Sequence, residues 1–265
     1  MISKKSVISG LTFASLILVG LYFFKNSENK SRIKSDLSSQ YVVSETDSLV
    51  KDKTKLIEVK CLSFNGEEKS ISIRVLDVMA NDVVEIFKEL KEMKFPIYTL
   101  SCYAPKTTVN KKKISLHAYA AAIDVNYLIN PYYDVVEGKM IPNRKKDRLE
   151  DIEIITKELK AIKIPKNEIK AILKTVIQLE ESDDRFLNRG IIRKGMITLE
   201  IVKIFKKHGF NIWGGKWRRP IDYMHFQIPR PLAKQLLNAN LETRKKIWQT
   251  HKEKCQLGET LSDES

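Results

Sequence analysis

The segment that most constrains this chain is an uncharged run near its N-terminus. Ser6 to Phe24 holds 19 consecutive residues without a charge, and Lys4 and Lys5 precede it. As a helix this run would be about 28 Å long, close to the thickness of the hydrocarbon core of a bilayer. The residues that follow contain no small-x-small cleavage site of the kind that ends a signal peptide. The sequence therefore predicts an uncleaved membrane anchor over residues 1–25, with a cleaved signal peptide as the alternative.

The remaining chain is long enough to form a domain with its own hydrophobic core. Of the 265 residues of the whole chain, 43% are hydrophobic and 30% are charged, which excludes a largely disordered chain and a polytopic membrane protein. The formal net charge of +14 favours anionic surroundings, namely nucleic acid, anionic lipid or an acidic wall polymer, without choosing among them. Three cysteines without a CxxC pair are too few for a disulfide framework.

Changes in composition divide the chain into regions. Residues 26–55 are rich in Ser, Lys and Asp and predict a flexible linker. A folded domain is expected over 56–240, with a helical insertion at 147–181 in which Pro165 separates two helices. Residues 241–265 are expected to form a polar C-terminal tail.

Local patterns predict both strands and helices within the domain. Alternating apolar residues flank Asn65-Gly66, a dipeptide that favours tight turns, and so predict a β-hairpin. Asp82 to Glu85 has a capping-box pattern that predicts a helix with Asp82 as its cap. Thr198 is expected to cap a later helix that ends before Gly209. This mixture predicts an α+β fold.

Two short segments carry residues suited to metal chemistry. His117 and Asp124 lie seven residues apart, which suits a loop ligand followed by a strand ligand, and His225 supplies a third candidate. Two histidines and an aspartate suit a catalytic Zn²⁺, although a structural role for either histidine remains open. Asp124 stands in the apolar run Ala-Ala-Ile-Asp-Val, where a buried carboxylate needs a cation or strong hydrogen-bond donors. Asp222, three residues before His225, is placed to act as a general base beside the metal.

Several motifs occur in an order that resembles the M15 peptidase family, and subfamily C in particular. They are Ser115-x-His117-x6-Asp124, Gly-Gly-x-Trp217 and Asp222-x-x-His225-Phe. The resemblance implies a small antiparallel sheet with flanking helices, as in Hedgehog and D,D-peptidase domains. It also implies a zinc metallopeptidase that cleaves peptidoglycan stem peptides, as a D-alanyl-D-alanine carboxypeptidase or an L-alanyl-D-glutamate endopeptidase.

The resemblance assigns roles by motif position. His117, Asp124 and His225 would bind Zn²⁺, and Asp222 would be the catalytic base. Ser115 would lie behind the ligands, Trp217 would wall the cleft, and Lys106 would occupy the place of a catalytic arginine in the family. Two further departures from the family pattern are Ala120, where glycine is usual, and Gln227, where glutamate is common.

The same resemblance leads to expectations about partners and location. We expect peptidoglycan peptides as substrates, no nucleic acid and a monomer held in the cell membrane by one helix. The catalytic domain is expected on the extracytoplasmic or periplasmic side, although the lysines on both sides of the anchor do not clearly favour this orientation. The alternative function is a catalytically inactive M15-like domain that binds cell-wall peptides.

Overall fold

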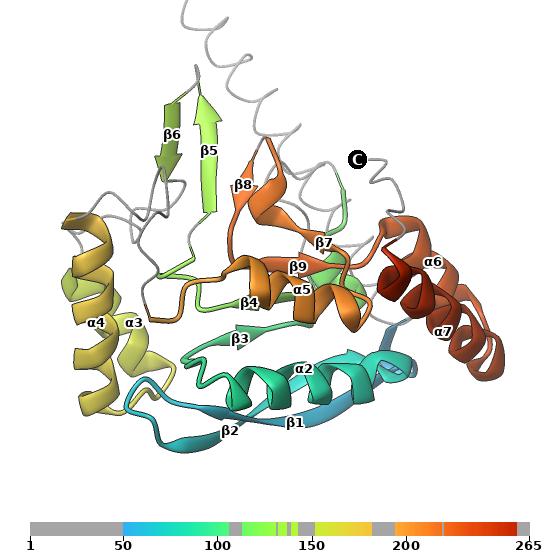
Figure 1. The fold of residues 1–265 in the computed structure, drawn as a ribbon, viewed down its shortest axis with the longest axis horizontal. Helices are drawn as coiled ribbons and strands as arrows, with labels where there is room; N and C mark the ends of the chain where they lie inside the picture. The colour runs from blue at the N-terminus through green and yellow to red at the C-terminus, as the bar shows by residue number, and fades with distance from the viewer. Residues whose placement is uncertain are drawn as a thin grey trace, which may run out of the picture.

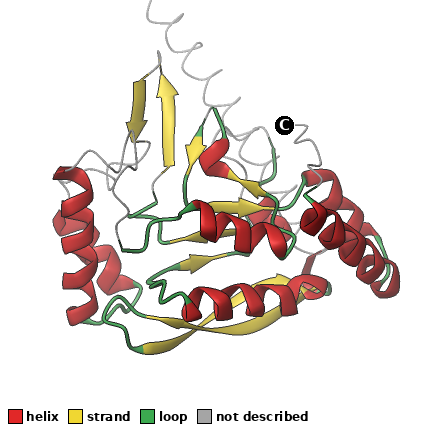
Figure 2. Ribbon diagram, viewed as in Figure 1, coloured by secondary structure: helices red, strands yellow, loops and turns green. Residues whose placement is uncertain are grey.

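The computed structural model describes residues 50–105, 113–130, 132–136, 139–142, 152–181, 194–218 and 220–258. The predicted anchor at Ser6–Phe24 and the predicted catalytic Lys106 lie outside these ranges. Within them, no helix has the length and apolar character needed to cross a membrane. Small antiparallel sheets and surrounding helices confirm the α+β prediction (Figure 2).

The predicted hairpin forms one side of the domain. β1 (Thr54–Leu62) pairs antiparallel with β2 (Glu68–Leu76) along their whole lengths. Ile57, Val59 and Cys61 alternate on the buried face of β1, while Gly66 takes the positive φ of +85° that the turn requires. The hairpin prediction is therefore confirmed.

Helix α2 (Ala80–Glu92) lies along this hairpin (Figure 1). It buries Val83, Ile86, Phe87 and Leu90, which share one face at helical spacing. The expectation that Asp82 caps the helix is wrong. A short 3₁₀ turn, η1 (Asp77–Met79), leads directly into the helix, so Asp82 lies in its first turn.

Two further sheets complete the strand framework. The four-stranded sheet has the order β3-β4-β9-β7, formed by Leu100–Ser101, Ala122–Val125, His225–Gln227 and Ile212–Trp213. The three-stranded sheet has the order β6-β5-β8, formed by Lys139–Pro142, Tyr132–Val136 and Ile221–Asp222. Both sheets are antiparallel, and a two-residue turn leads from β8 into β9.

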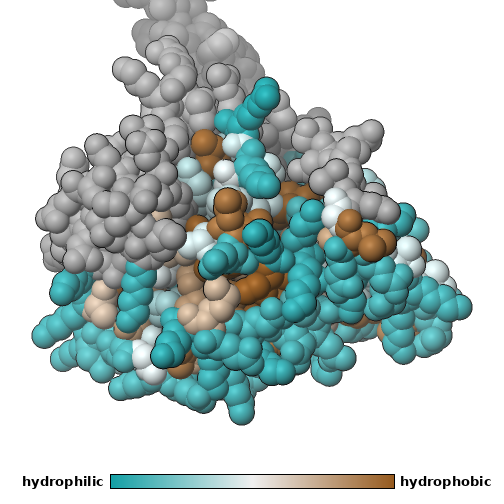
Figure 3. All heavy atoms as spheres, viewed as in Figure 1, coloured by the Kyte–Doolittle hydropathy of each residue, from teal (hydrophilic) through white to brown (hydrophobic). Residues whose placement is uncertain are grey.

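Helix α5 (Leu199–Lys207) joins the hairpin side of the domain to the four-stranded sheet. Its cap is Thr198, whose side chain accepts a hydrogen bond from the Ile201 amide, as the sequence predicts. Phe205 stacks on Phe226 of β9 at 3.8 Å between ring centroids and also meets Phe87 of α2 edge-on. This apolar contact fixes β9 from behind. Around the core, hydrophilic residues cover most of the described surface over the hairpin and α2 (Figure 3).

The two helices expected within the insertion are present as α3 (Ile152–Ala161) and α4 (Lys166–Glu181). Ile169 and Ile172 of α4 belong to a second apolar cluster with Phe64, next to the hairpin turn. The buried Glu168 carboxylate accepts hydrogen bonds from the Phe64 amide at 3.1 Å and from Lys69 Nζ at 2.8 Å. The helical pair is thus tied to the hairpin by apolar and charged contacts.

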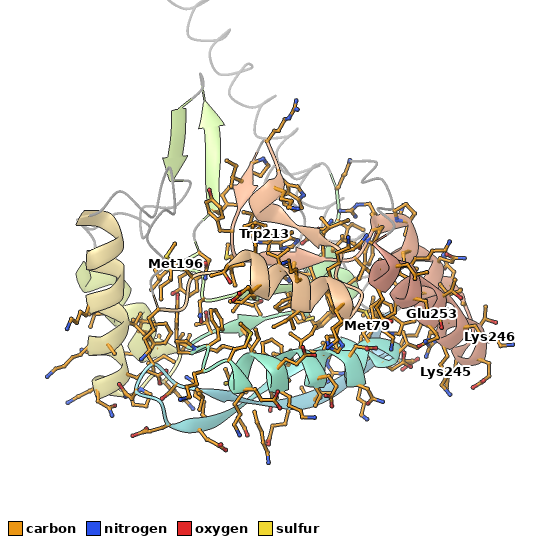
Figure 4. All side chains as sticks on the ribbon, in the orientation of Figure 1. Met79, Met196, Trp213, Lys245, Lys246 and Glu253 are labelled. Atoms are coloured by element: carbon orange, nitrogen blue, oxygen red, sulfur yellow. The ribbon has the colours of Figure 1, made fainter. Side chains whose placement is uncertain are left out.

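The C-terminal region differs from the expected polar tail. After α6 (Arg230–Asn238), residues Leu241–Leu257 form helix α7, capped by the Asn240 side chain. Its inward stripe is buried and consists of Arg244, Trp248, His251 and Cys255. The outward residues Lys245, Lys246 and Glu253 point away from the domain (Figure 4).

Polar contacts explain why α7 belongs to the domain. Arg244 pairs with Asp77, and Trp248 Nε1 donates a hydrogen bond to Asp82 at 2.8 Å. The expected linker is also shorter than predicted, because Val50 is completely buried and Lys53 Nζ donates a hydrogen bond to the Leu237 carbonyl. The expectations of a tail from 241 and of a linker up to 55 are therefore wrong at these residues.

Candidate metal centre

The first candidate ligand, His117, lies on η2 (Leu116–Tyr119), a short 3₁₀ turn before β4. The Ser115 Oγ accepts a hydrogen bond from the His117 amide at 3.3 Å and so caps this turn. Ala120 then adopts a left-handed conformation with φ of +53° and ψ of +31°, which directs the chain into β4. The expected arrangement of a loop residue followed by a strand residue is therefore present.

Asp124 and His225 come together through strand pairing. They are directly opposite each other in the antiparallel register of β4 and β9. Cross-strand neighbours point to the same face of a sheet, and here the Asp124 Oδ1 lies 2.8 Å from the His225 Nδ1. The Nε2 of His117 lies 3.1 Å from the same oxygen and 3.3 Å from His225 Nδ1. Three potential ligand atoms thus converge on one point.

The spacing of these atoms fits a small metal ion. A tetrahedral Zn²⁺ with ligand bonds of about 2.0–2.1 Å has its ligand atoms about 3.3 Å apart. Two of the three observed separations, 3.1 and 3.3 Å, are close to this value, and the third is shorter at 2.8 Å. Within the part of the chain that the structure describes, His117, Asp124 and His225 are the only such group of three or more side chains. The residues present therefore fit a single metal with two nitrogen ligands and one oxygen ligand.

Each histidine has a hydrogen-bond acceptor on its other ring nitrogen. The Nδ1–H of His117 donates to the Cys102 carbonyl at 2.6 Å, and the Nε2–H of His225 donates to Gln227 Oε1 at 2.8 Å. Such partners orient histidine ligands and fix which nitrogen carries the proton. Neither acceptor was predicted from the sequence as a partner of a ligand. The pattern His225-x-Gln227 on a strand was the one sequence feature that could have indicated such a partner.

The charge state of Asp124 reflects its largely buried position, with 15% of the side chain exposed. Burial favours the neutral carboxyl, but the charges and hydrogen bonds of His117 and His225 outweigh it and hold the Asp124 pKa well below its usual range. Burial also opposes the charge on His225, yet the hydrogen bond and charge of Asp124 raise its pKa to about 9. The expectation that the buried carboxylate has strong positively charged or donor partners is thus confirmed.

Asp222 lies beside the three converging residues. It is buried on β8, and its negative charge contributes to the raised pKa of His225. Gly214 allows this placement, because a Cβ at that position would lie only 2.5 Å from the Asp222 carbonyl oxygen. The indole of Trp213 reaches across to the same turn and donates a hydrogen bond to the Tyr223 carbonyl (Figure 4).

The other residues near the centre contribute in different ways. The Trp217 ring lies 5.3 Å from the His225 ring, between centroids, so this tryptophan borders the candidate centre. Ser115 acts through the backbone of His117, as described above. Cys102 contributes its carbonyl, while burial and the Asp124 charge raise the pKa of its thiol.

Two buried asparagines support the centre and were not predicted. Asn126 follows β4 with φ of +50°, and its side chain bonds the Tyr98 amide at 2.9 Å and the Pro96 carbonyl at 2.8 Å. Asn130 bonds the Gly195 carbonyl and the Ile197 amide. These bonds hold the end of β4, and therefore Asp124, against neighbouring segments. The one local feature that could have indicated the role of Asn126 is that asparagine tolerates positive φ better than most residues.

The fold and the candidate centre together define a mixed α/β domain with a candidate site for a single metal ion. Residues 108–228 match the family model described as D-alanyl-D-alanine carboxypeptidase, a segment that contains all three candidate ligands and Asp222. This match supports the M15 peptidase family for residues 108–228. No curated protein and no solved structure matches the chain. The predicted family is confirmed, and its assignment to subfamily C stays a prediction.

Proposed function

We propose that the chain is a Zn²⁺-dependent peptidase that hydrolyses peptide bonds in peptidoglycan stem peptides. The observation that carries this proposal is the convergence of His117 Nε2, Asp124 Oδ1 and His225 Nδ1 within the segment that matches a peptidase family. A largely buried carboxylate needs positively charged or donor partners, and a metal ion bound by it and two histidines would be one such partner. Membership of a peptidase family supports hydrolysis as the use of that cation.

Zinc suits the three residues in both chemistry and number. Histidine nitrogen and aspartate oxygen are common zinc ligands, and a catalytic zinc has three protein ligands with one open position. When bound, Zn²⁺ supplies a Lewis acid that polarises the carbonyl of a peptide bond and makes a water molecule acidic near neutral pH. His117, Asp124 and His225 would hold the ion in a centre bordered by Trp217.

We assign the proton transfers of hydrolysis to Asp222. Its charge acts on His225, so the carboxylate lies close to the centre, although it is not one of the three converging groups. A carboxylate in this position can accept a proton from the attacking water and then give it to the nitrogen of the leaving amine. Lys106 is proposed as the cation that attracts the substrate carbonyl or a stem-peptide carboxylate.

The proposal also includes a location. Ser6–Phe24 would hold a monomeric protein in the cell membrane, with the peptidase domain on the extracytoplasmic side, where peptidoglycan is found. This placement rests on the uncharged length of that run. The positive charge of the chain suits an anionic cell wall and requires no nucleic-acid partner.

Digestion of purified peptidoglycan tests the proposed function. The full-length protein, purified in detergent, would be incubated with peptidoglycan fragments with and without added Zn²⁺, and the products would be identified by mass spectrometry. Release of terminal D-alanine would indicate carboxypeptidase action, whereas cleavage inside the stem would indicate endopeptidase action. Asp222→Asn serves as the matched inactive control.

A different result would favour the alternative function. If the protein bound one Zn²⁺ and bound stem peptides but released no product, it would be a catalytically inactive M15-like domain. If it bound neither zinc nor stem peptides, both interpretations would be wrong.

A further inference from the structure

Gln227 is a side chain outside the three candidate ligands that contacts one of them directly. It stands two residues after His225 on β9, so both side chains point to the same face of the strand. The Gln227 Oε1 lies 2.8 Å from the Nε2 of His225. This contact is on the side of the imidazole opposite to Asp124.

The strand around Gln227 holds this side chain in place. β9 lies between β4 and β7, and Gln227 is paired with Ala122 on one side and with Ile212 on the other. Both neighbours are buried, so the position of the Gln227 backbone is well determined by the sheet.

The chemistry of the contact determines which nitrogen of His225 can bind a metal. A neutral imidazole has one N–H donor and one nitrogen with a free lone pair. The Gln227 Oε1 can only accept a hydrogen bond, so it selects the form of His225 that is protonated at Nε2. Nδ1, which faces Asp124 Oδ1 at 2.8 Å, is then the nitrogen that would bind a metal in place of this contact.

His117 also has an oxygen acceptor on one ring nitrogen, but the roles of Nδ1 and Nε2 are exchanged. The Cys102 carbonyl accepts from His117 Nδ1, which leaves Nε2 of His117 for the metal. The two ligand nitrogens are therefore of different types, and each is selected by an oxygen acceptor on the far side of its ring. A backbone carbonyl cannot be removed by substitution, whereas the Gln227 amide can.

We propose that Gln227 is a positioning residue that fixes the tautomer and the ring orientation of His225 for zinc binding. This inference rests on the proposed zinc centre. Loss of such a partner typically weakens metal binding by about 10–100-fold. Because the amide is neutral, a carboxylate at the same position would accept the same hydrogen bond and add attraction for the cation.

Zinc affinity, measured by competition with a chromogenic chelator, tests the role of Gln227 in the full-length protein. Gln227→Met keeps the length of the side chain but removes the acceptor, and we expect it to bind zinc about 10–100-fold more weakly. Gln227→Glu should bind zinc at least as tightly as the wild type. Gln249→Met, the same change on the exposed face of α7, should leave the affinity unchanged.

Two additional measurements separate positioning from a general loss of structure. Thermal unfolding of the metal-free proteins should be similar for Gln227→Met and Gln227→Glu, although their zinc affinities differ. The visible absorption of the Co²⁺-loaded proteins should change in Gln227→Met and be restored in Gln227→Glu. If Gln227→Met does not fold, Gln227→Ala replaces it in the same comparison.

The possible failures can be distinguished. A wild type that binds no zinc would overturn the proposed function, whatever the variants do. A wild type that binds zinc, with Gln227→Met binding equally well, would overturn the positioning role alone. Equal weakening in Gln227→Met and Gln227→Glu would also overturn it, since the acceptor would then not be what matters.

Discussion

Asp124 and His225 face each other across two adjacent antiparallel strands, with 2.8 Å between the Asp124 Oδ1 and the His225 Nδ1. The register of β4 and β9 therefore sets the distance between two candidate metal ligands that are far apart in the sequence. A shift of one residue in that register would turn one of the two side chains to the opposite face. The stacked rings of Phe205 and Phe226 stabilise the register from behind the sheet.

The two aspartates near the centre should respond differently to the loss of charge. We expect Asp222→Asn to retain one zinc and to lose about 10²–10⁴-fold in hydrolysis, the usual cost of removing a general base. Asp124→Asn should lose most of the zinc, because two ligands rarely hold a catalytic zinc tightly. Elemental analysis and steady-state rates check both variants. Zinc loss in Asp222→Asn with retention in Asp124→Asn would mean that the two roles are exchanged.

Two substitutions, one that keeps the charge and one that removes it, test the cation proposed at Lys106. Lys106→Arg should preserve or raise the rate, because arginine keeps the charge and adds a second parallel donor. Lys106→Ala should lower the rate on a stem-peptide substrate by about 10²–10³-fold. Lys245→Ala, on the outward face of α7, is the control for a surface lysine. Unchanged activity in Lys106→Ala would move the role to another cation, with Lys111, Lys112, Lys113 and Arg189 as candidates.

The proposed anchor predicts firm association with membranes. The full-length protein should stay in the membrane fraction after a wash with high salt, because the attraction of Ser6–Phe24 for a bilayer is apolar and is not screened. Deletion of residues 2–25 should release the protein into the soluble fraction. N-terminal sequencing of the mature protein is the decisive measurement. A first residue near Lys25 would indicate a cleaved signal peptide.

Patterns of local origin were well predicted from the sequence. The hairpin follows from alternating apolar residues around Asn65-Gly66, and the start of α5 follows from Thr198 as a cap. The need of Asp124 for a cation or strong donors was predicted because it is a charged residue in an apolar run. Each of these inferences depends on a few consecutive residues.

Features that depend on distant partners were missed. Helix α7 has an inward stripe with two polar residues, Arg244 and His251, and these are buried because Asp77 and the Gly209 carbonyl receive their hydrogen bonds. A hydrophobic pattern cannot reveal such a helix. The misassigned cap has the same cause, since Asp82 serves Trp248 of α7 instead of its own helix end.

His208 predicts a pH-dependent contribution to stability. Burial lowers its pKa, but hydrogen bonds to Asp82 and Glu89 outweigh this effect and raise the pKa above the usual value. A raised pKa means that the protonated form stabilises the fold, fully below about pH 6.5 and less as the pH rises through the folded-state pKa. We expect His208→Gln to cost about 1–2 kcal/mol of unfolding free energy near pH 6.

The charged groups around His208 make its contribution depend on pH, so a comparison at two pH values is the control. Asp82 and Glu89 of α2 contact His208 directly, and Lys252 of α7 and Lys207 of α5 bond these two carboxylates. Denaturant unfolding of wild type and His208→Gln should be compared between about pH 6 and pH 9. The difference should shrink at the higher pH. A constant difference would mean that His208 contributes by packing alone.

Ala120 holds a conformation that glycine would adopt at lower cost. Its φ of +53° lies in the left-handed region, where a side chain with a Cβ costs about 1–2 kcal/mol. Replacement by glycine removes this strain but also removes a buried methyl group worth about 0.8 kcal/mol. We therefore expect Ala120→Gly to raise the unfolding free energy by roughly 0.2–1.2 kcal/mol. Ala121→Gly is the matched control, because Ala121 is equally buried and is not among the described residues with positive φ. That control should lower stability by about 1 kcal/mol. The same loss in both variants, measured by denaturant unfolding, would show that the turn between His117 and Asp124 is not strained by alanine.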